Sequence, residues 1–405
     1  MDNNTPKHAG KRFKQAVPVQ DGATTQPKTN PRFKQGSVVS NNSVSKANTI
    51  NIPTNNNKKP KKKNSVGKNI GLGVLFVVLA LAVVAFAYVH HINKQMAIKD
   101  QQEAQELQKV LDKQKEDNEF YVMLIGSDAR GDNTSGSRSD VNMLVHVSLN
   151  NGVVELISVP RDTAINLPGH GKQKINAAYA FDGPSGIVQV MNEFAGVPIR
   201  HYVEVRFQDV VTVVDMLGGV EVNLPQGLHE MGANFGPGVH KLNGKQALAF
   251  ARARHTMKGG DFARAQAQRV VVQAIIDKVM SAPVNEMPGM ISNIAGCVQT
   301  DMNVNDLVDM ATKLQGKGFK MYSAVCPSYT FNENGISYVG TMYDEWKTMM
   351  QRVDASMDPN STEGTIPEKQ KNNAKLGQAN NGAGYKDYHD RAKSSMTTDD
   401  VVPEK

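Results

Sequence analysis

Apolar and polar residues are distributed very unevenly along the chain. Residues 1–68 are polar and contain almost no clustered aliphatic side chains, so we predict a disordered segment that cannot bury enough apolar surface to fold. From Ile70 to Val89, twenty consecutive residues carry no charge. A helix of this length spans about 30 Å, the thickness of the hydrocarbon core of a bilayer. We therefore predict a single transmembrane helix over residues 69–91.

The pattern after this helix predicts three further segments. Residues 92–117 lack Gly and Pro and are rich in helix-forming side chains, with only a weak apolar stripe. This composition favours a helical stalk over a sustained coiled coil. Repeated apolar runs, typical of a folded domain, cover residues 118–354. Residues 355–405 are polar again and are predicted to form a disordered tail.

Within the domain, short apolar runs bounded by turn residues predict strands, and longer runs ending at Gly or polar residues predict helices. The predicted strands cover 120–126, 141–149, 153–160, 199–206, 220–224 and 319–325. The predicted helices cover 184–196, 207–219, 242–252, 259–282 and 304–318. The turn Asn-Asn-Gly joins two neighbouring strands as a hairpin. We therefore predict an α/β fold, an α-β-α layered domain around a mixed sheet.

Charge fixes the expected orientation of the membrane helix. Residues 1–68 hold 14 Lys and Arg but only 2 Asp and Glu, whereas the whole chain has a net charge of +7. The basic character belongs to the tail, so net charge gives no support for a nucleic-acid partner. Five lysines between Lys58 and Lys63 precede the helix and are placed to contact anionic membrane lipid. The positive-inside rule places the N-terminus in the cytoplasm and residues 92–405 outside the cell.

Cysteine usage leaves one question open. Cys297 and Cys326 both lie in the part predicted to be outside the cell, where a disulfide is permitted. Two cysteines do not establish a bridge, so the paired and unpaired states are equally compatible with the sequence.

Four stretches concentrate charge where the pattern predicts the ends of strands or helices. Arginine matches phosphate oxygens with its planar fork, and aspartates at strand ends suit Mg²⁺ that is shared with phosphates. Such a set can bind and transfer a phosphoryl group, although surface ion pairs would explain the same residue types. The charged or amide residues of the four stretches are Asp128, Arg130, Arg138 and Asp140; Arg161, Asp162, Lys172 and Lys174; Arg252 and Arg254; and Asp261, Arg264 and Gln268.

Spacing adds some geometry to these candidates. Arg264 and Gln268 are four residues apart and would share one face of a helix. Arg252 and Arg254 would point to opposite sides of a helix and can converge only where the chain is extended. No Gly-Lys-Ser/Thr phosphate loop, Gly-x-Ser-x-Gly elbow or paired His/Cys metal spacing is present in the sequence.

Five blocks of the sequence resemble, in order and spacing, the pattern of the LytR-CpsA-Psr family. They lie within about residues 118–282 and read MLIGSDARGDNTSGSRSDVNMLVHVS, ISVPRDTAINLPGHGKQKINAAYAFDG, VVDMLGGVEVNLP, GVHKLNGKQALAFARARH and GGDFARAQAQ. The resemblance implies a phosphotransferase at the outer face of a Gram-positive-type cell membrane. Such enzymes move teichoic acid, capsule or a similar glycopolymer from a polyprenyl-pyrophosphate carrier to peptidoglycan, and a pyrophosphatase side activity is expected.

The resemblance also implies roles for individual residues. Asp128 and Asp140 match aspartates that hold Mg²⁺ at the pyrophosphate, with Mn²⁺ as the alternative ion. The candidate catalytic residues are Asp128, Arg138, Asp140 and Arg161. The pyrophosphate-binding candidates, with Lys174 included for its charge, are Arg138, Arg161, Lys174, Arg252, Arg254, Arg264 and Gln268. An apolar pocket between sheet and helices is expected to take the prenyl tail, but the sequence does not distinguish it from an ordinary core.

Two positions depart from the family pattern. Ala267 stands where a second arginine usually follows Arg264, and Arg269 lies about 140° from Arg264 around a helix, which makes it a poor substitute. Val141 stands where the family favours threonine. The loss of one positive group keeps a second hypothesis open, a non-catalytic module that binds polyprenyl phosphate or wall precursors. The predicted topology argues against a transcriptional regulator, because the charged blocks would lie outside the cell.

Overall fold

The computed structural model describes most of the chain that follows the N-terminal segment. The described residues are 66–113, 118–129, 136–224, 227–229, 232–253, 261–379 and 395–396. The prediction of disorder for 1–68 thus falls almost wholly outside the described residues, and Arg130 and Arg254 also lie outside them.

A mixed sheet of six strands forms the centre of the domain, in the order β10-β3-β2-β1-β6-β9. The parallel pairs are β1–β6 and β3–β10, and the other neighbours are antiparallel. The predicted mixed sheet and the hairpin joining β2 to β3 are confirmed. The strand bounds are β1 Glu119–Ser127, β2 Ser139–Ser148, β3 Val153–Ser158, β6 Ile199–Arg206, β9 Gln299–Thr300 and β10 Lys320–Val325.

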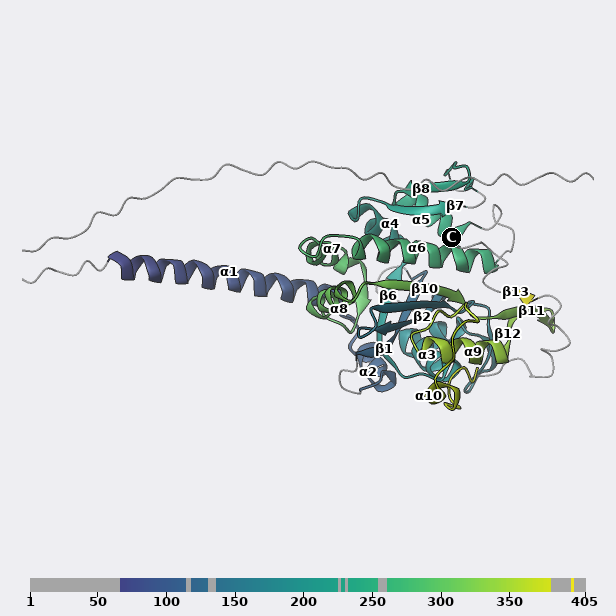
Figure 1. Cartoon of the computed structure of the whole chain (residues 1–405). Helices are drawn as coiled ribbons and strands as arrows, with labels where there is room; N and C mark the ends of the chain where they lie inside the picture. The colour runs from purple at the N-terminus through teal and green to yellow at the C-terminus, as the bar shows by residue number, and fades with distance from the viewer. Residues whose placement is uncertain are drawn as a thin grey trace, which may run out of the picture. The chain divides into compact units, whose positions relative to one another are not determined.

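Helices cover both faces of this sheet, which confirms the α-β-α layering (Figure 1). One layer contains α2 Gln101–Val110, α3 Ala177–Ala195 and α9 Tyr343–Val353. The other contains α4 Phe207–Met216, α5 Gly244–Arg252, α6 Asp261–Met280, α7 Met287–Ile294 and α8 Val304–Gly316. Successive side chains of a strand point to opposite faces, so Met123 and Ile125 pack in the first layer while Val122 packs in the second.

The domain also contains smaller strands and helices outside the central sheet. Among these described elements, only β7 matches a predicted strand. Their strands form three separate small sheets and do not extend the central sheet. The elements are β4 Ala164–Leu167 with β5 Gly171–Lys174, β7 Val220–Leu224 with β8 Gly238–Leu242, the three strands β11 Ser328–Glu333, β12 Ile336–Thr341 and β13 Ser395–Met396, the 3-10 helix η1 Ala295–Cys297, and α10 Glu368–Lys371.

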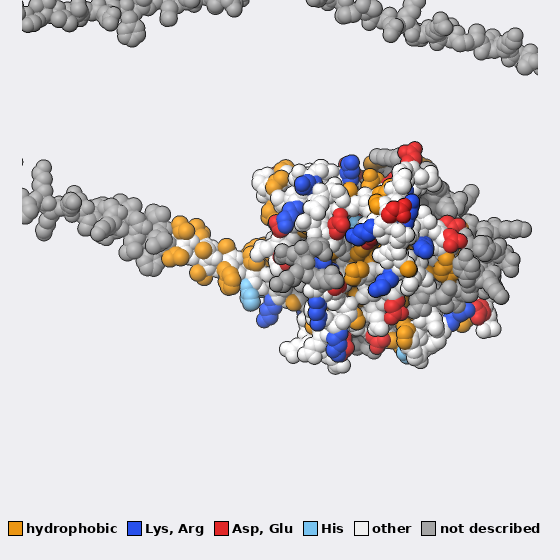
Figure 2. Space-filling model, turned by 60° about the horizontal axis from the view of Figure 1, so that its bottom comes forward, with side chains coloured by type: hydrophobic (Ala, Val, Ile, Leu, Met, Phe, Trp, Pro, Cys, Tyr) orange, Lys and Arg blue, Asp and Glu red, His pale blue; other side chains and the backbone are white. Residues whose placement is uncertain are grey.

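The helix α1, Val66–Met96, precedes the domain, and its part Val77–Met96 is long and apolar enough to cross a membrane. Figure 2 shows its described apolar side chains standing clear of the domain, whose surface in this view mixes basic and acidic side chains. The last turns differ, because Ile92 and Met96 are buried against the domain. α1 contacts η1, β9 and α8 there, and the Asn93 Oδ1 atom accepts a hydrogen bond from the backbone N–H of Val304 at 2.9 Å. This geometry is consistent with a single-pass anchor that docks on the domain.

In the segment predicted as a separate stalk, 92–117, the described residues 92–113 instead form part of the domain. The side chain of Asp100 caps α2 by accepting hydrogen bonds from two backbone N–H groups. Leu107 and Leu111 are buried in the same core as α3, although their apolar stripe is weak. A weak stripe is sufficient here because the facing helix α3 supplies most of the apolar surface.

The folded part also continues beyond the boundary predicted at 354. Leu376 and Ala379 are buried in the core under α3 and α9, and the Gly377 N–H donates to the Ala195 carbonyl at 2.8 Å. The prediction of disorder from residue 355 is therefore wrong for residues 355–379. The polar composition misleads because only a few apolar positions dock this segment.

The two cysteines are unpaired. Cys326 is buried and Cys297 is partly buried, and both are free thiols. Burial raises the pKa of the Cys326 thiol to about 12, which makes it an inert core residue.

Candidate functional site

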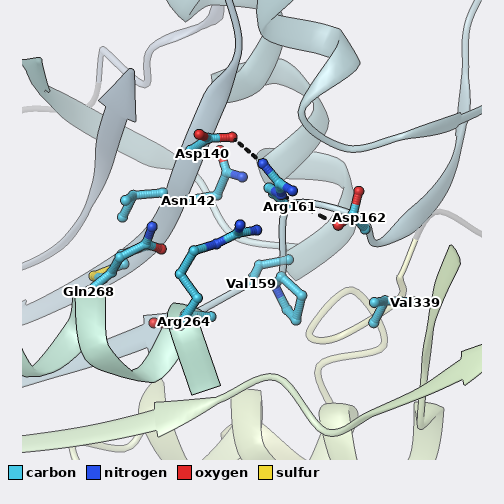
Figure 3. A pocket seen from close by; sticks show the side chains of 13 residues that line it. Asp140, Asn142, Val159, Arg161, Asp162, Arg264, Gln268 and Val339 are labelled. Carbon is cyan, nitrogen blue, oxygen red and sulfur yellow. Dashed lines mark hydrogen bonds and ion pairs between the residues drawn. The ribbon is translucent and has the colours of Figure 1, made fainter. Parts of the chain in front are cut away.

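A pocket lies where the end of β3 meets the start of β2 and the first turns of α6 (Figure 3). Three segments that contain charged stretches of the sequence converge on it, and Val339 of β12 adds an apolar side chain. Its charged and amide side chains are Asp140, Asn142, Arg161, Asp162, Arg264 and Gln268.

The turn after β3 projects two of these side chains. Pro160 follows the strand, and its carbonyl accepts hydrogen bonds from both the N–H (3.0 Å) and the hydroxyl (2.6 Å) of Thr163. A proline cannot donate to a further strand pair, so the ladder ends and the chain turns. Arg161 and Asp162 occupy that turn, at the rim of the sheet.

Ion pairs link the pocket into a chain of alternating charge. The Arg161 Nη1 atom lies 2.8 Å from Asp140 Oδ1, and its Nε lies 3.4 Å from Asp162 Oδ2. The Lys174 Nζ on β5 lies 2.8 Å from Asp162 Oδ1. All four side chains are partly buried, so water screens these interactions less than it would on an open surface.

Asp162 is held in its ionised form. Burial by itself would raise the pKa of this carboxyl, but the hydrogen bond from Lys174 and the charges of Arg161, Lys174 and Arg264 outweigh burial. The pKa of Asp162 consequently lies below its ordinary value of 3.8. Asp162 therefore anchors cations and is a weak base.

Helix α6 contributes the opposite wall. Arg264 and Gln268 both line the pocket and are buried, in agreement with their four-residue spacing on one helix face. Arg269 is completely buried and does not line the pocket, as its angular position implied. Ala267 packs in an apolar cluster with α5.

Asp128 and Arg138 face each other across the base of the loop between β1 and β2. The Asp128 Oδ1 atom accepts a hydrogen bond from the Arg138 N–H at 2.8 Å, and the Asp128 N–H donates to the Arg138 carbonyl at 3.3 Å. These bonds pin both ends of the loop beside Asp140. Both side chains are exposed, and neither lines the pocket that contains Asp140.

The third charged stretch begins at the end of α5. Arg252 is the last residue of this helix, and its guanidinium carbon lies 5.0 Å from the centre of the Phe207 ring. Ala253 leaves the helical conformation, with ψ of 129°. An extended residue after Arg252 is the condition under which Arg252 and Arg254 can point to the same side.

The predictions omitted two polar groups that line the pocket. Asn142 and Ser158 are both buried, and neither the Asn142 Oδ1 atom nor the Ser158 Oγ atom has a hydrogen-bond partner among the described residues. Polar groups without a protein partner are uncommon in folded interiors, and in a pocket they can pair with a bound water or ligand. In the sequence, the only indication of these polar groups is Asn142, an asparagine inside the apolar run VNMLVHV.

An apolar cavity of about 180 Å³ lies next to this pocket, between the sheet and the helices α4, α5 and α6. Among the described residues, Gln268 is the only polar one that lines the cavity, and Gln268 and Val141 line both spaces. Along α6 the lining extends from Gln268 to Ile276, about 12 Å at the helical rise per residue. At the far end it includes Ile294 and Val298, which flank η1, where α1 docks.

Comparison with known proteins decides the family. The model of the LytR_cpsA_psr family matches residues 85–355, a range that includes α2 and the whole central sheet. The chain belongs to the LytR-CpsA-Psr family.

Curated relatives and a solved structure are also similar to this chain. The polyisoprenyl-teichoic acid–peptidoglycan teichoic acid transferase TagU of Oceanobacillus iheyensis is 35% identical over 241 residues, which is 56% of this chain and 75% of the relative. TagU of Enterococcus faecalis is 31% identical over 222 residues, 54% and 73% of the two chains. The structure of TagT bound to LI-WTA is similar with a TM-score of 0.52 at 26% identity, and covers 61% of this chain and 94% of that chain.

The acidic residues of the site are too few to bind a metal ion by themselves, and a substrate would have to supply further ligands. Within the described part of the chain, no three His, Cys, Asp or Glu side chains form a group that could hold a metal. Mg²⁺ commonly takes one or two carboxylates when phosphates supply further ligands. Asp140 in the pocket and Asp128 at the end of the neighbouring strand fit this simpler requirement.

Proposed function

We propose that the chain transfers a glycopolymer, such as teichoic acid or capsule, from a polyprenyl-pyrophosphate carrier to peptidoglycan. The observation that carries this proposal is the junction at Gln268 and Val141, which line both the charged pocket and the apolar cavity. A ligand that fits both spaces has an anionic head joined to an apolar chain. A polyprenyl pyrophosphate has this structure, and the names of the TagU relatives support the polymer and the acceptor.

The charged side chains would bind the pyrophosphate and stabilise the group that leaves. Arg161 and Arg264 present guanidinium groups whose forks suit phosphate oxygens, and Lys174 adds a further positive charge. An acceptor hydroxyl oxygen attacks the phosphorus that carries the glycan, and the bond to the polyprenyl phosphate breaks. The hydroxyl proton passes to a carboxylate of the site. The arginines then stabilise the charge on the departing polyprenyl phosphate.

The remaining assignments follow from this proposal. Arg138, Arg252 and Arg254 would contact the distal part of the pyrophosphate or the glycan. A Mg²⁺ ion, or Mn²⁺ in its place, held by Asp140 and Asp128 would neutralise phosphate charge when bound. Water in place of the acceptor hydroxyl would give a pyrophosphatase side activity.

The membrane arrangement is part of the same proposal. With α1 as a single-pass anchor and the N-terminus in the cytoplasm, the domain lies on the outer surface. The cavity then runs from the charged pocket towards α7 and η1, on the side from which α1 leaves the domain (Figure 1). The part of a long prenyl chain that the cavity cannot hold would exit there towards the bilayer.

The test uses the full chain in lipid vesicles with a polyprenyl-pyrophosphate-linked glycan and peptidoglycan. Arg161→Ala and Asp140→Ala should each lower transfer at least about a hundredfold, the cost of removing one group that stabilises a charged transition state. Lys172→Ala is the matched control, because Lys172 lies on β5 with Lys174 but pairs with Glu333 outside the pocket. Normal transfer by Arg161→Ala would show that the site is misassigned.

Two further arms separate the alternatives. Chelation of divalent ions should stop transfer, and Mg²⁺ should restore it. If the wild-type chain binds the lipid but transfers no glycan with Mg²⁺ present, the non-catalytic binding module is the better description. The position of Ala267, packed against α5, gives no separate support to that alternative.

A further inference from the structure

Asn142 lines the charged pocket and carries a buried hydrogen-bond acceptor. Its side chain is only 2% exposed, and its Nδ2 atom donates to the Ser139 carbonyl at 3.4 Å. In the flipped amide, Oδ1 would face the Ser139 carbonyl oxygen, and two acceptors would meet. The contact therefore favours the orientation in which Nδ2 faces Ser139. The Oδ1 atom has no hydrogen-bond partner within the described residues, and Figure 3 shows the amide beside Asp140 and Arg161.

The Asn142 Oδ1 atom can form a hydrogen bond only with a group that donates one. An ionised phosphate has only acceptor atoms and gains nothing from a carbonyl oxygen. A sugar hydroxyl donates a hydrogen bond and needs such a partner when it leaves water. The pocket supplies cationic side chains for phosphate and two buried neutral groups, Asn142 and Ser158, of which only the Asn142 Oδ1 atom can accept but not donate. The two kinds of group suit a phosphate and a hydroxyl side by side.

We propose that Asn142 binds the attacking hydroxyl of the acceptor sugar, through a hydrogen bond from that hydroxyl to the Oδ1 atom. This inference rests on the proposed function and adds the residue that orients the nucleophile. An amide is too weak a base to remove the proton, which passes to a carboxylate of the site as the oxygen bonds to phosphorus. Asn142 acts by holding the oxygen in line with the bond that breaks.

The decisive variant is Asn142→Leu, which keeps the approximate volume and removes the acceptor. The substitution removes a buried Oδ1 atom without a partner and one long Nδ2 hydrogen bond of 3.4 Å, so the folded chain should be about as stable. Transfer should nevertheless fall about tenfold or more in kcat, with unchanged affinity for the lipid-linked donor measured without acceptor. Asn142→Asp retains an acceptor oxygen and should transfer faster than Asn142→Leu.

Gln315→Leu is the matched control. The Gln315 amide has the same arrangement, with Nε2 donating to the carbonyls of Met280 and Ala282 and a buried Oε1 without a partner, but it lies on α8 away from the pocket. This control should transfer at the wild-type rate.

The possible outcomes separate this inference from the proposed function. If the wild-type chain transfers glycan and Asn142→Leu transfers equally well, the inference is wrong and the proposed function stands. Loss of donor affinity in Asn142→Leu would assign the amide to the carrier lipid, and loss of stability would make it a structural residue; both overturn the inference. If the wild-type chain itself transfers nothing, both proposals fail together.

Discussion

Under α3 and α9, the central sheet buries large side chains almost completely, including Trp346, Tyr179 and Phe194. Under α4 and α6, the same sheet keeps a cavity of about 180 Å³ lined by aliphatic side chains such as Val203, Val272 and Ile276. Both layers are built from ordinary core residues, so residue type does not explain the difference. What differs is how far the helices and side chains close over the sheet.

The cavity has an energetic consequence. At about 24 cal/mol per Å³ of cavity, a space of this size costs about 4 kcal/mol of stability if nothing fills it. One larger side chain at any of several lining positions would reduce that cost. The comparison of the two layers therefore supports the proposal that the cavity binds an apolar ligand, while the other layer contributes more to the stability of the fold.

The largest expected effect is on the free energy of unfolding, through a residue of the layer under α3 and α9, which we call the packed layer. Phe194 is completely buried, its ring centre lies 5.3 Å from that of Trp346, and its carbonyl accepts a hydrogen bond from the Trp346 indole. Phe194→Ala should lower the free energy of unfolding by about 3–5 kcal/mol, because both the buried area and the packing are lost. Denaturant unfolding of the full chain in detergent measures this value. A loss below about 1 kcal/mol would mean that this layer is not tightly packed.

In the layer that contains the cavity, a larger side chain should have a smaller effect on the free energy of unfolding, and of the opposite sign. Val272→Phe should fill part of the cavity and leave the free energy of unfolding unchanged or raise it by about 1 kcal/mol, while binding of a polyprenyl phosphate is lost. The matched control is Val188→Phe in the packed layer, where an additional ring should cost about 1–3 kcal/mol. Unfolding midpoints and lipid binding of the two variants test the comparison directly. Equal destabilisation by both would contradict it.

Ligand binding should also distinguish the two variants. A lipid at a hundred times its Kd stabilises the chain that binds it by about 2.7 kcal/mol, through mass action alone. Val188→Phe should retain this shift, because its cavity is intact, and Val272→Phe should lose it. Melting curves with and without polyprenyl phosphate measure the difference, and a shift in both variants would place the lipid elsewhere.

The central part of the fold could be predicted from the sequence because its elements bury whole faces. The strands β1, β2, β3 and β6 and the helices α4 and α6 follow the predicted apolar runs to within a few residues. The hairpin β4–β5 could not be predicted in this way, because local turns and the ion pairs of Lys172 and Lys174 hold a polar strand in place. Helix α9 is different: Tyr343, Trp346 and Met350 are buried at helical spacing, a signal that was present but not assigned.

The site was predictable in its charges but not in its shape. Arginine and aspartate types indicated phosphate chemistry, and the structure brings Asp140, Arg161 and Arg264 into one pocket. The sequence could not separate Asp140, which lines the pocket, from Asp128, which pins the loop beside it. Nor could it reveal the cavity, because the valines and isoleucines that line a cavity are the same residues that fill a core.

The smallest of the expected effects concerns Glu103, a carboxyl of α2 beside the packed layer whose pKa is raised. Glu204 is buried on β6, where the hydroxyls of Ser127 and Tyr179 donate to its Oε1 atom at 2.5 and 2.6 Å. Glu103 on α2 lies nearby. Burial, followed by the charges of Glu204 and Asp100, raises the pKa of Glu103 from its ordinary 4.5 to about 7, although Arg206 opposes the shift.

The raised pKa of Glu103 determines how the stability of the folded chain changes with pH. The folded chain holds the proton of Glu103 more tightly than the unfolded chain, so its stabilising effect is complete below pH 4.5 and is lost as pH rises through about 7. Glu103→Gln mimics the protonated form at every pH. Relative to this variant, the wild-type chain should lose stability between pH 5 and pH 8, by less than about 1 kcal/mol because the carboxyl is half-exposed and water screens its charge. Unfolding curves of the two proteins at these pH values provide the test. Parallel profiles would show that α2 docks on the packed layer without any proton linkage at this carboxyl.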